Sequence, residues 1–248
     1  MKLRRPPRRG EAVEGPALNP GISDQLLRQG LGRIGLQATP AQLEAFALYR
    51  SELLRWAPRV NLTGFKTDGA IFREGFLRSL SYRVAFEPAP GIRALDIGSG
   101  AGFPGLVLKI CYPEIDMLLV EAARRRVTFL RSLIRQLGLT GARCLHVRAE
   151  QLQGDTAHHA RYQVAFARAV GSLAEVVALA EPLLAPGGRL VLQVGQRSAQ
   201  SFAGLRPRLA TLGLTAVQGE SAALGPMIPP TKLLVIEKSP SAGSGNPP

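Results

Sequence analysis

The segment from Ala94 to Gly105 constrains the fold of this chain more than any other part of the sequence. It begins as an apolar strand ending at Asp96, continues through a glycine-rich turn and leads into the start of a helix. Because glycine lacks a Cβ atom and tolerates positive φ, a ligand can approach the backbone of such a turn closely. The helix that follows points unpaired N–H groups at the same place. The segment therefore predicts a ligand-binding strand–turn–helix unit.

Two ligand-binding patterns fit these letters. Residues 100–105 match G-x-G-x-x-G, the dinucleotide fingerprint, whereas residues 96–102 match D-x-G-x-G-x-G, a pattern of S-adenosylmethionine binding. Charge separates the two, because Asp96 would repel a pyrophosphate but suits the ammonium and sulfonium groups of S-adenosylmethionine. Glu121, after the apolar run 116–120, fits the ribose of either ligand. We therefore favour S-adenosylmethionine over a dinucleotide. The remaining alternative is a glycine turn that only packs the strand against the helix, and we disfavour it because Asp96 and Glu121 end adjacent strands.

Composition limits the class of protein. The chain has 248 residues, is 46% hydrophobic and contains no apolar run of the length that spans a membrane. Its charged, Pro-rich beginning lacks the apolar core of a secretory signal. Cys111 and Cys144 lie in predicted element interiors, as expected for buried thiols in a reducing cytoplasm. The histidines, His146, His158 and His159, have no ligand spacing with either cysteine. We expect a cytoplasmic protein without a membrane segment or a metal.

A formal net charge of +13 indicates a polyanionic partner, for which nucleic acid is the first candidate. Part of this charge lies in the segment 1–10, where arginines occur among prolines. The alternative explanation of the net charge is therefore that it comes from basic, disordered tails. The remainder is still basic, chiefly through arginine, whose guanidinium matches phosphate and stacks on bases.

The chain divides into four parts by composition and periodicity: a basic tail over 1–20, a helical N-terminal region over 21–87, an alternating strand–helix domain over 88–238, and a tail over 239–248. In the helical region we predict helices over 22–36, from Thr39-Pro40 to just before Pro58, and over 69–86.

The third part predicts an α/β fold with a Rossmann-like, seven-stranded, mostly parallel sheet. The expected strands are 92–96, 116–120, 143–147, 162–167, 188–194, 214–219 and 232–237. The expected helices are 103–111, 122–138, 172–184 and 199–211. No helix separates the last two strands, so we expect a terminal hairpin with one antiparallel strand. The carboxyl ends of the strands place Asp96 and Glu121 at one crevice.

Several motifs are similar to those of the RsmG family, also called glucose-inhibited division protein B, and the resemblance covers about residues 40–238. The most specific motif runs from Asp96 to Gly105, with its Phe-Pro-Gly ending. Further matching segments are Val60-Asn61-Leu62-Thr63, Arg125-Arg126-Val127, Phe129-Leu130, Arg148-Ala149-Glu150, Arg168-Ala169 and Gly187-Gly188.

The resemblance implies a class I methyltransferase that uses S-adenosylmethionine to methylate guanine N7 in 16S ribosomal RNA. Its partner would be this RNA or the small ribosomal subunit, and we expect a monomer. The implied cofactor residues at the methionine end are Asp96, Gly98, Gly100, Gly102 and Phe103. Glu121 would hold the ribose, Ala149 and Glu150 would border the adenine, and Arg168 would stand between the cofactor and the target base. The alternatives from the residues alone are a solvated loop for 149–150 and a structural ion pair for Arg168.

Four positions depart from the family pattern. Gly75 and Arg78 replace a histidine and an acid, Val194 replaces a lysine, and Thr231 replaces an arginine. These changes leave two alternatives open: a divergent paralogue with another RNA site, and an inactive RNA-binding relic. The chemistry tolerates such changes, because guanine N7 carries no proton that a general base would remove.

Overall fold

The computed structural model describes residues 20–65, 67–168, 171–194, 198–221, 224 and 227–240. The predicted tails, 1–20 and 239–248, lie outside these ranges except for Pro20, Ser239 and Pro240.

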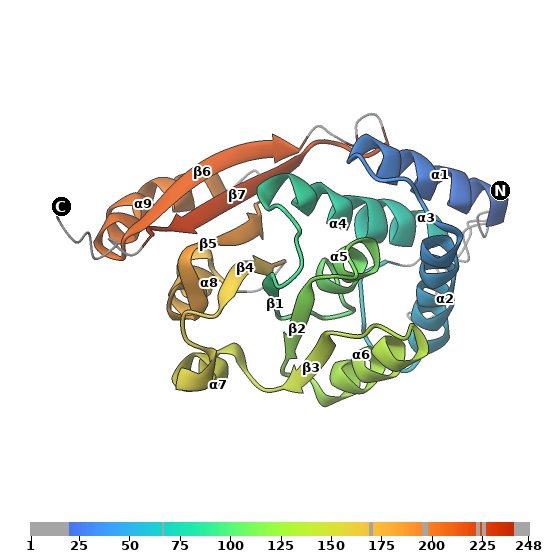
Figure 1. Ribbon diagram of the computed structural model, residues 1–248, viewed down its shortest axis with the longest axis horizontal. Coiled ribbons are helices and arrows are strands. Elements are labelled where there is room, and N and C mark those ends of the chain that lie inside the picture. Colours follow the sequence, from blue (N-terminus) through green and yellow to red (C-terminus); the bar gives the residue numbers. More distant parts are fainter. Residues whose placement is uncertain are drawn as a thin grey trace, which may run out of the picture.

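A seven-stranded sheet forms the centre of the molecule, in the order β3-β2-β1-β4-β5-β7-β6 (Figure 1). The strands are β1 Arg93–Ile97, β2 Asp116–Glu121, β3 Ala142–His146, β4 Tyr162–Ala167, β5 Leu184–Gln193, β6 Leu214–Ser221 and β7 Thr231–Lys238. The first five pair in parallel, whereas β7 lies antiparallel between β5 and β6. The predicted α/β fold and the terminal hairpin with one antiparallel strand are therefore confirmed.

Helices cover both faces of this sheet. The face that carries Met117 and Phe166 packs against the N-terminal helices, α5 (Gly105–Cys111) and α6 (Arg124–Gln136). The opposite face, with Leu118 and Ala165, packs against α7 (Ala149–Gly154), α8 (Leu173–Ala180) and α9 (Ser198–Thr211). Strands buried on both faces explain the near-continuous apolar runs in the sequence.

The N-terminal helices α1 (Pro20–Arg33) and α2 (Pro40–Trp56) lie beside this sheet and share its hydrophobic core (Figure 1). As predicted, Thr39 caps α2: its hydroxyl accepts from the Gln42 N–H, and the Gln42 side chain accepts from the Thr39 N–H. Division of the chain at residue 87 stays a prediction.

The helix predicted over 69–86 corresponds to a helical segment from Asp68 to Ala85, but this segment is not one regular α-helix. This segment is α3 (Asp68–Ala70), a π-helix (Ile71–Leu77), α4 (Arg78–Leu80) and a 3₁₀ helix (Ser81–Ala85). Two serine hydroxyls in this segment donate hydrogen bonds to main-chain carbonyl groups. Ser79 donates to the Gly75 oxygen and Ser81 to the Arg78 oxygen, both over 2.6 Å. Such local bonds compete with the regular helix ladder, and π-helical turns are frequent at functional sites.

Two other boundaries needed correction. The helix predicted over 172–184 ends at Ala180 and continues as a 3₁₀ turn, because Pro182 has no N–H to donate. Strand β5 then begins at Leu184, before the glycine pair that we expected to open it, and the register with β4 shifts across this stretch. Helix α7 has no counterpart among the expected helices.

Candidate active site

A pocket of about 500 Å³ lies at the carboxyl ends of the central strands. One wall is the turn after β1, represented by Gly98, Gly100 and Phe103. The facing wall is the loop 61–65 of the helical region, and Arg126 and Arg168 complete the lining. Pockets of this size, at the edge where parallel strands end, are the usual ligand sites of α/β sheets.

Glycine is required in the turn by its backbone. Gly98, Gly100 and Gly102 have φ angles of 67°, 57° and 95°, in the left-handed region. A Cβ atom on Gly102 would lie 2.6 Å from the Tyr49 hydroxyl, and that hydroxyl donates a 2.6 Å hydrogen bond to the Ala101 oxygen. Tyr49 comes from α2, so the helical region holds the turn in place. Sequence reasoning missed this residue, because an interior tyrosine carries no signal of its partner.

Asp96 lies behind the turn and is fully buried, so its side chain does not line the pocket. Its Oδ2 accepts a 3.0 Å hydrogen bond from the Gly105 N–H at the start of α5. Its Oδ1 has no hydrogen-bond partner among the described residues. Burial raises the pKa of Asp96 to about 7, and the Gly105 hydrogen bond acts against this rise. A cation brought close to this carboxyl would favour its ionised form.

Glu121 closes the turn from the end of β2. Its Oε2 accepts from the Gly100 N–H over 2.9 Å, and its Oε1 accepts from the Ala123 N–H over 2.8 Å. Arg126 lies 3.8 Å from the same carboxylate. Because each carboxylate oxygen has a second lone pair, Glu121 retains acceptor capacity for hydroxyl groups.

Arg168 follows β4 and carries a positive charge into the lining of the pocket. Its Nη2 donates a 2.6 Å hydrogen bond to the Glu74 main-chain oxygen, while its buried Nη1 has no partner in the described ranges. The guanidinium carbon lies 5.8 Å from the Phe65 ring centroid and 6.0 Å from that of Phe103. Desolvation lowers the pKa of Arg168, and proximity to Tyr82 acts against this. The unpartnered N–H groups can therefore donate to an anionic ligand.

The predicted site residues fall into three groups. Gly98, Gly100, Phe103 and Arg168 line the pocket. Asp96 and Glu121 lie directly behind it and accept hydrogen bonds from Gly105 and Gly100, while Gly102 belongs to the turn without lining the pocket. Ala149 and Glu150 form the first turn of α7 and do not line it. Their assignment to an adenine, like the other roles, stays a prediction.

Two parts of the lining were not predicted as site residues. The loop 61–65 contains the Asn-Leu-Thr motif and Arg126 belongs to an arginine triplet, so both signals were visible in the sequence. Among the described residues, no group of three His, Cys, Asp or Glu side chains could hold a metal. No helix in the same ranges is long and apolar enough to cross a bilayer.

The four positions expected to depart from the family pattern do not line this pocket, but several of them contact residues at its edge or one another. A Cβ atom on Gly75 would lie 2.8 Å from Cζ of Phe103, so the Phe103 ring lies directly against this glycine. Arg78 pairs with Glu74 and also donates to Thr231. Val194 donates its N–H to the oxygen of Lys232, the residue after Thr231.

Solved structures share this architecture. A Corynebacterium glutamicum protein superposes with a TM-score of 0.55 at 19% identity, over 87% of this chain and 96% of that one. A putative transferase of Pyrococcus horikoshii gives 0.50 at 12% identity, over 63% of this chain and 61% of that one. With its strand order and glycine turn, the fold is that of the class I, Rossmann-like methyltransferases.

The sequence comparisons narrow this class to one family. The family model "GidB: rRNA small subunit methyltransferase G" matches residues 42–223. Proteins named ribosomal RNA small subunit methyltransferase G from a Geobacter species and from Chloroflexus aggregans are each 38% identical to this chain. The alignments cover 76% and 88% of this chain, and 85% and 91% of those proteins, respectively. The chain belongs to the family of ribosomal RNA small subunit methyltransferase G, as the motifs predicted.

S-adenosylmethionine is the cofactor of such a protein, and the residues present fit it. The buried carboxyl of Asp96, directly behind the turn, is of the sign that would compensate the positive groups of the cofactor, and the unpartnered Nη1 of Arg168 suits its carboxylate. The three turn glycines leave the backbone open to a close approach.

Proposed function

We propose that this protein transfers the methyl group of S-adenosylmethionine to N7 of a guanine in 16S ribosomal RNA. It would act as a monomer in the cytoplasm, on the RNA or on the small subunit. The observation that carries the proposal is the pocket between the Gly98–Phe103 turn and loop 61–65, with the cationic Arg168 in its wall. Family membership supports the RNA substrate.

The proposed chemistry asks the protein for positioning above all. When bound, the cofactor supplies an electrophilic methyl group. The N7 lone pair lies in the plane of the guanine ring and carries no proton, so no residue has to act as a general base. The protein has to hold N7 close to and in line with the methyl group, which is a matter of orientation and exclusion of water.

Each residue has a distinct part in this proposal. Asp96 compensates the positive charge of the cofactor from behind the turn, and Glu121 receives the ribose hydroxyls while it keeps Gly100 in place. Arg168 donates from Nη1 either to the cofactor carboxylate or to O6 of guanine, the acceptor next to N7 that arginine recognises in nucleic acids. Ala149 and Glu150, in the first turn of α7, border the adenine, whose amino group donates to Glu150.

A transfer assay tests the proposal. Purified protein is incubated with methyl-labelled S-adenosylmethionine and with small subunits, or naked 16S RNA, from a strain lacking the gene. N7-specific strand cleavage then locates the label. We expect label at one guanine N7. Label at another atom would support a divergent paralogue, and cofactor binding without transfer to either RNA would support an inactive relic. Binding of a nicotinamide dinucleotide in place of S-adenosylmethionine would exclude all three.

A further inference from the structure

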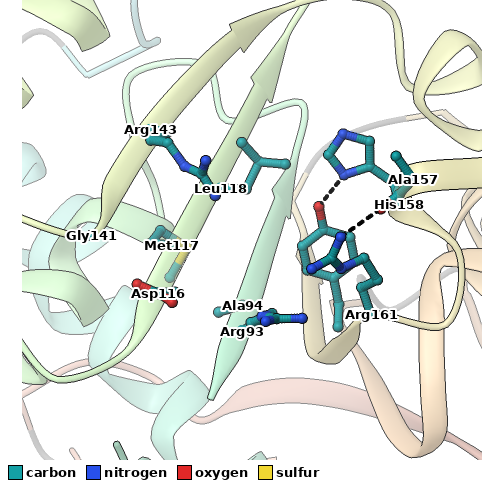
Figure 2. A pocket seen from close by; sticks show the side chains of 11 residues that line it. Arg93, Ala94, Asp116, Met117, Leu118, Gly141, Arg143, Ala157, His158 and Arg161 are labelled. Atoms are coloured by element: carbon teal, nitrogen blue, oxygen red, sulfur yellow. Dashed lines mark hydrogen bonds between the residues drawn. The ribbon is translucent and has the colours of Figure 1, made fainter. Parts of the chain in front are cut away.

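A second pocket, here called the amino-edge pocket, lies at the opposite edge of the sheet from the candidate active site. It has a volume of about 300 Å³ and is lined by the starts of β1 and β2, by β3 and by the segment 157–162 (Figure 2). The five residues of β1 separate the two pockets by roughly 15 Å of strand. A ligand bound here therefore cannot contact the reacting base.

Three arginines give the amino-edge pocket a positive charge. Arg93 enters from β1, Arg143 from β3 and Arg161 from the residue before β4 (Figure 2). In the described ranges none of the three forms an ion pair with a carboxylate, and the Arg161 side chain donates to the Ala157 main-chain oxygen. Asp116 is the single acid among the lining residues. Asp116 also interacts electrostatically with Lys109, because its charge acts against the fall that burial causes in the pKa of Lys109.

A buried tyrosine forms the back of this pocket. The Tyr162 hydroxyl and His158 Nδ1 lie 2.5 Å apart, and the two rings are nearly parallel, with an interplanar angle of 7°. Burial raises the pKa of Tyr162, while the positive charges of Arg161, Arg143 and Arg93 act against that rise. All three guanidiniums therefore act electrostatically on this phenol, and all three line the same pocket.

We propose that the amino-edge pocket binds a phosphate group of the RNA backbone. Guanidinium groups match phosphate oxygens in geometry and charge, and here three of them line one pocket that contains a single carboxylate, Asp116. All three arginine side chains are exposed, so a bound phosphate keeps part of its hydration. Sites for small metabolites bury most of their ligand, whereas a backbone phosphate of a long RNA does not need enclosure. The inference rests on RNA being the substrate.

The test compares two double variants with equal loss of charge. R93Q/R143Q removes two guanidiniums from the amino-edge pocket. The control, R33Q/R208Q, removes two exposed arginines from α1 and α9. Affinity for unmethylated 16S RNA is measured at several salt concentrations, together with S-adenosylmethionine affinity and the melting temperature. We expect R93Q/R143Q to bind RNA roughly tenfold more weakly, and the slope of log affinity against log salt to be shallower by about 1–2. Cofactor affinity and melting should stay at wild-type values.

Equal RNA affinities for R93Q/R143Q and R33Q/R208Q would overturn the proposal. A second experiment adds inorganic phosphate to each protein and measures the change in melting temperature. If R93Q/R143Q lost a phosphate effect but kept wild-type RNA affinity, the pocket would serve a free phosphate and the RNA proposal would again be wrong. Because the readout is RNA binding, a protein that binds RNA without methylating it would contradict the proposed function and leave this inference standing.

Discussion

Arg78 donates a hydrogen bond from Nη1 to Oγ1 of Thr231 over 3.1 Å, which joins two positions 153 residues apart in the chain. Both positions depart from the family pattern, and the structure places them in contact. The remaining donors of Arg78 go to the carboxylate of Glu74, whose main-chain oxygen receives Arg168. Arg78 and Thr231 thus form, with Glu74, a connected polar cluster that supports the cationic wall of the candidate active site.

Loss of this cluster should affect RNA methylation more than cofactor binding. We expect Arg78→Ala to lower kcat/KM for RNA several-fold and to cost about 1–2 kcal/mol of stability, because the buried Thr231 loses its donor. Thr231→Val removes the same hydrogen bond alone and should cost about 1 kcal/mol. Denaturant unfolding of both single variants and the double variant gives the coupling energy. Strictly additive losses would show that the Arg78–Thr231 bond contributes nothing.

Replacement of Arg168 should impair transfer strongly. Its guanidinium donates from Nη2 to the Glu74 main-chain oxygen and retains Nη1 as a donor for a ligand. Lysine has a single ammonium group, so it cannot present two nitrogen donors in one plane. We expect Arg168→Lys and Arg168→Ala each to lower kcat/KM by about 10²–10³. Arg33→Ala, an exposed arginine on α1, is the control. Wild-type single-turnover rates for Arg168→Lys would remove this residue from the site.

Stability without cofactor should depend on pH through Asp96. The pKa of Asp96 is raised to about 7 in the folded protein by burial, whereas an unfolded aspartate titrates near 4. Its contribution to stability is therefore complete below about pH 4 and is lost as the pH rises through 7, by about 4 kcal/mol in total. Asp96→Asn should lack this dependence and should be more stable than the wild type at pH 8. If the free energy of unfolding of the wild type and of Asp96→Asn changed equally between pH 5 and 8, Asp96 would not be the group responsible for the pH dependence.

Cofactor affinity should follow the opposite trend. S-adenosylmethionine is a cation at its sulfonium, so it should bind more tightly as Asp96 ionises between pH 6 and 8. Calorimetry in buffers of different ionisation enthalpy should detect proton release on binding. Asp96→Asn and Asp96→Ala should bind the cofactor at least about tenfold more weakly, since losing about 1.4 kcal/mol of charge pairing weakens binding tenfold. Unchanged affinity in both variants would mean that the pocket is not the cofactor site.

A side chain at position 75 should displace Phe103. The Cβ atom of Gly75→Ala would lie 2.8 Å from the ring of Phe103, which lines the candidate active site. We expect a loss of about 1–3 kcal/mol from this overpacking, together with weaker cofactor binding. Gly32→Ala is the matched control: its Cβ meets nothing within 4 Å on α1, so it should be neutral or stabilising. A stable Gly75→Ala variant would show that the Phe103 ring moves freely.

Local patterns in the sequence predicted most of the fold. The apolar runs located all seven strands, and only β5 began more than two residues from its expected start. The glycine turn from Gly98 to Gly102 was recognisable because positive φ requires glycine at these places. Asp96 and Glu121 were placed correctly at neighbouring strand ends, since parallel strands align their carboxyl ends.

Only the tertiary structure decided which groups these elements bring together. No local pattern indicates that Tyr49 holds the turn or that Asp96 lies behind the pocket, and the Asn-Leu-Thr motif of loop 61–65 does not show that this loop faces the turn. The strand–turn–helix segment is specified by periodicity and backbone geometry within about a dozen neighbouring residues. Contacts such as Arg78 with Thr231 depend instead on how distant elements pack, and that depends on the fit of the whole core.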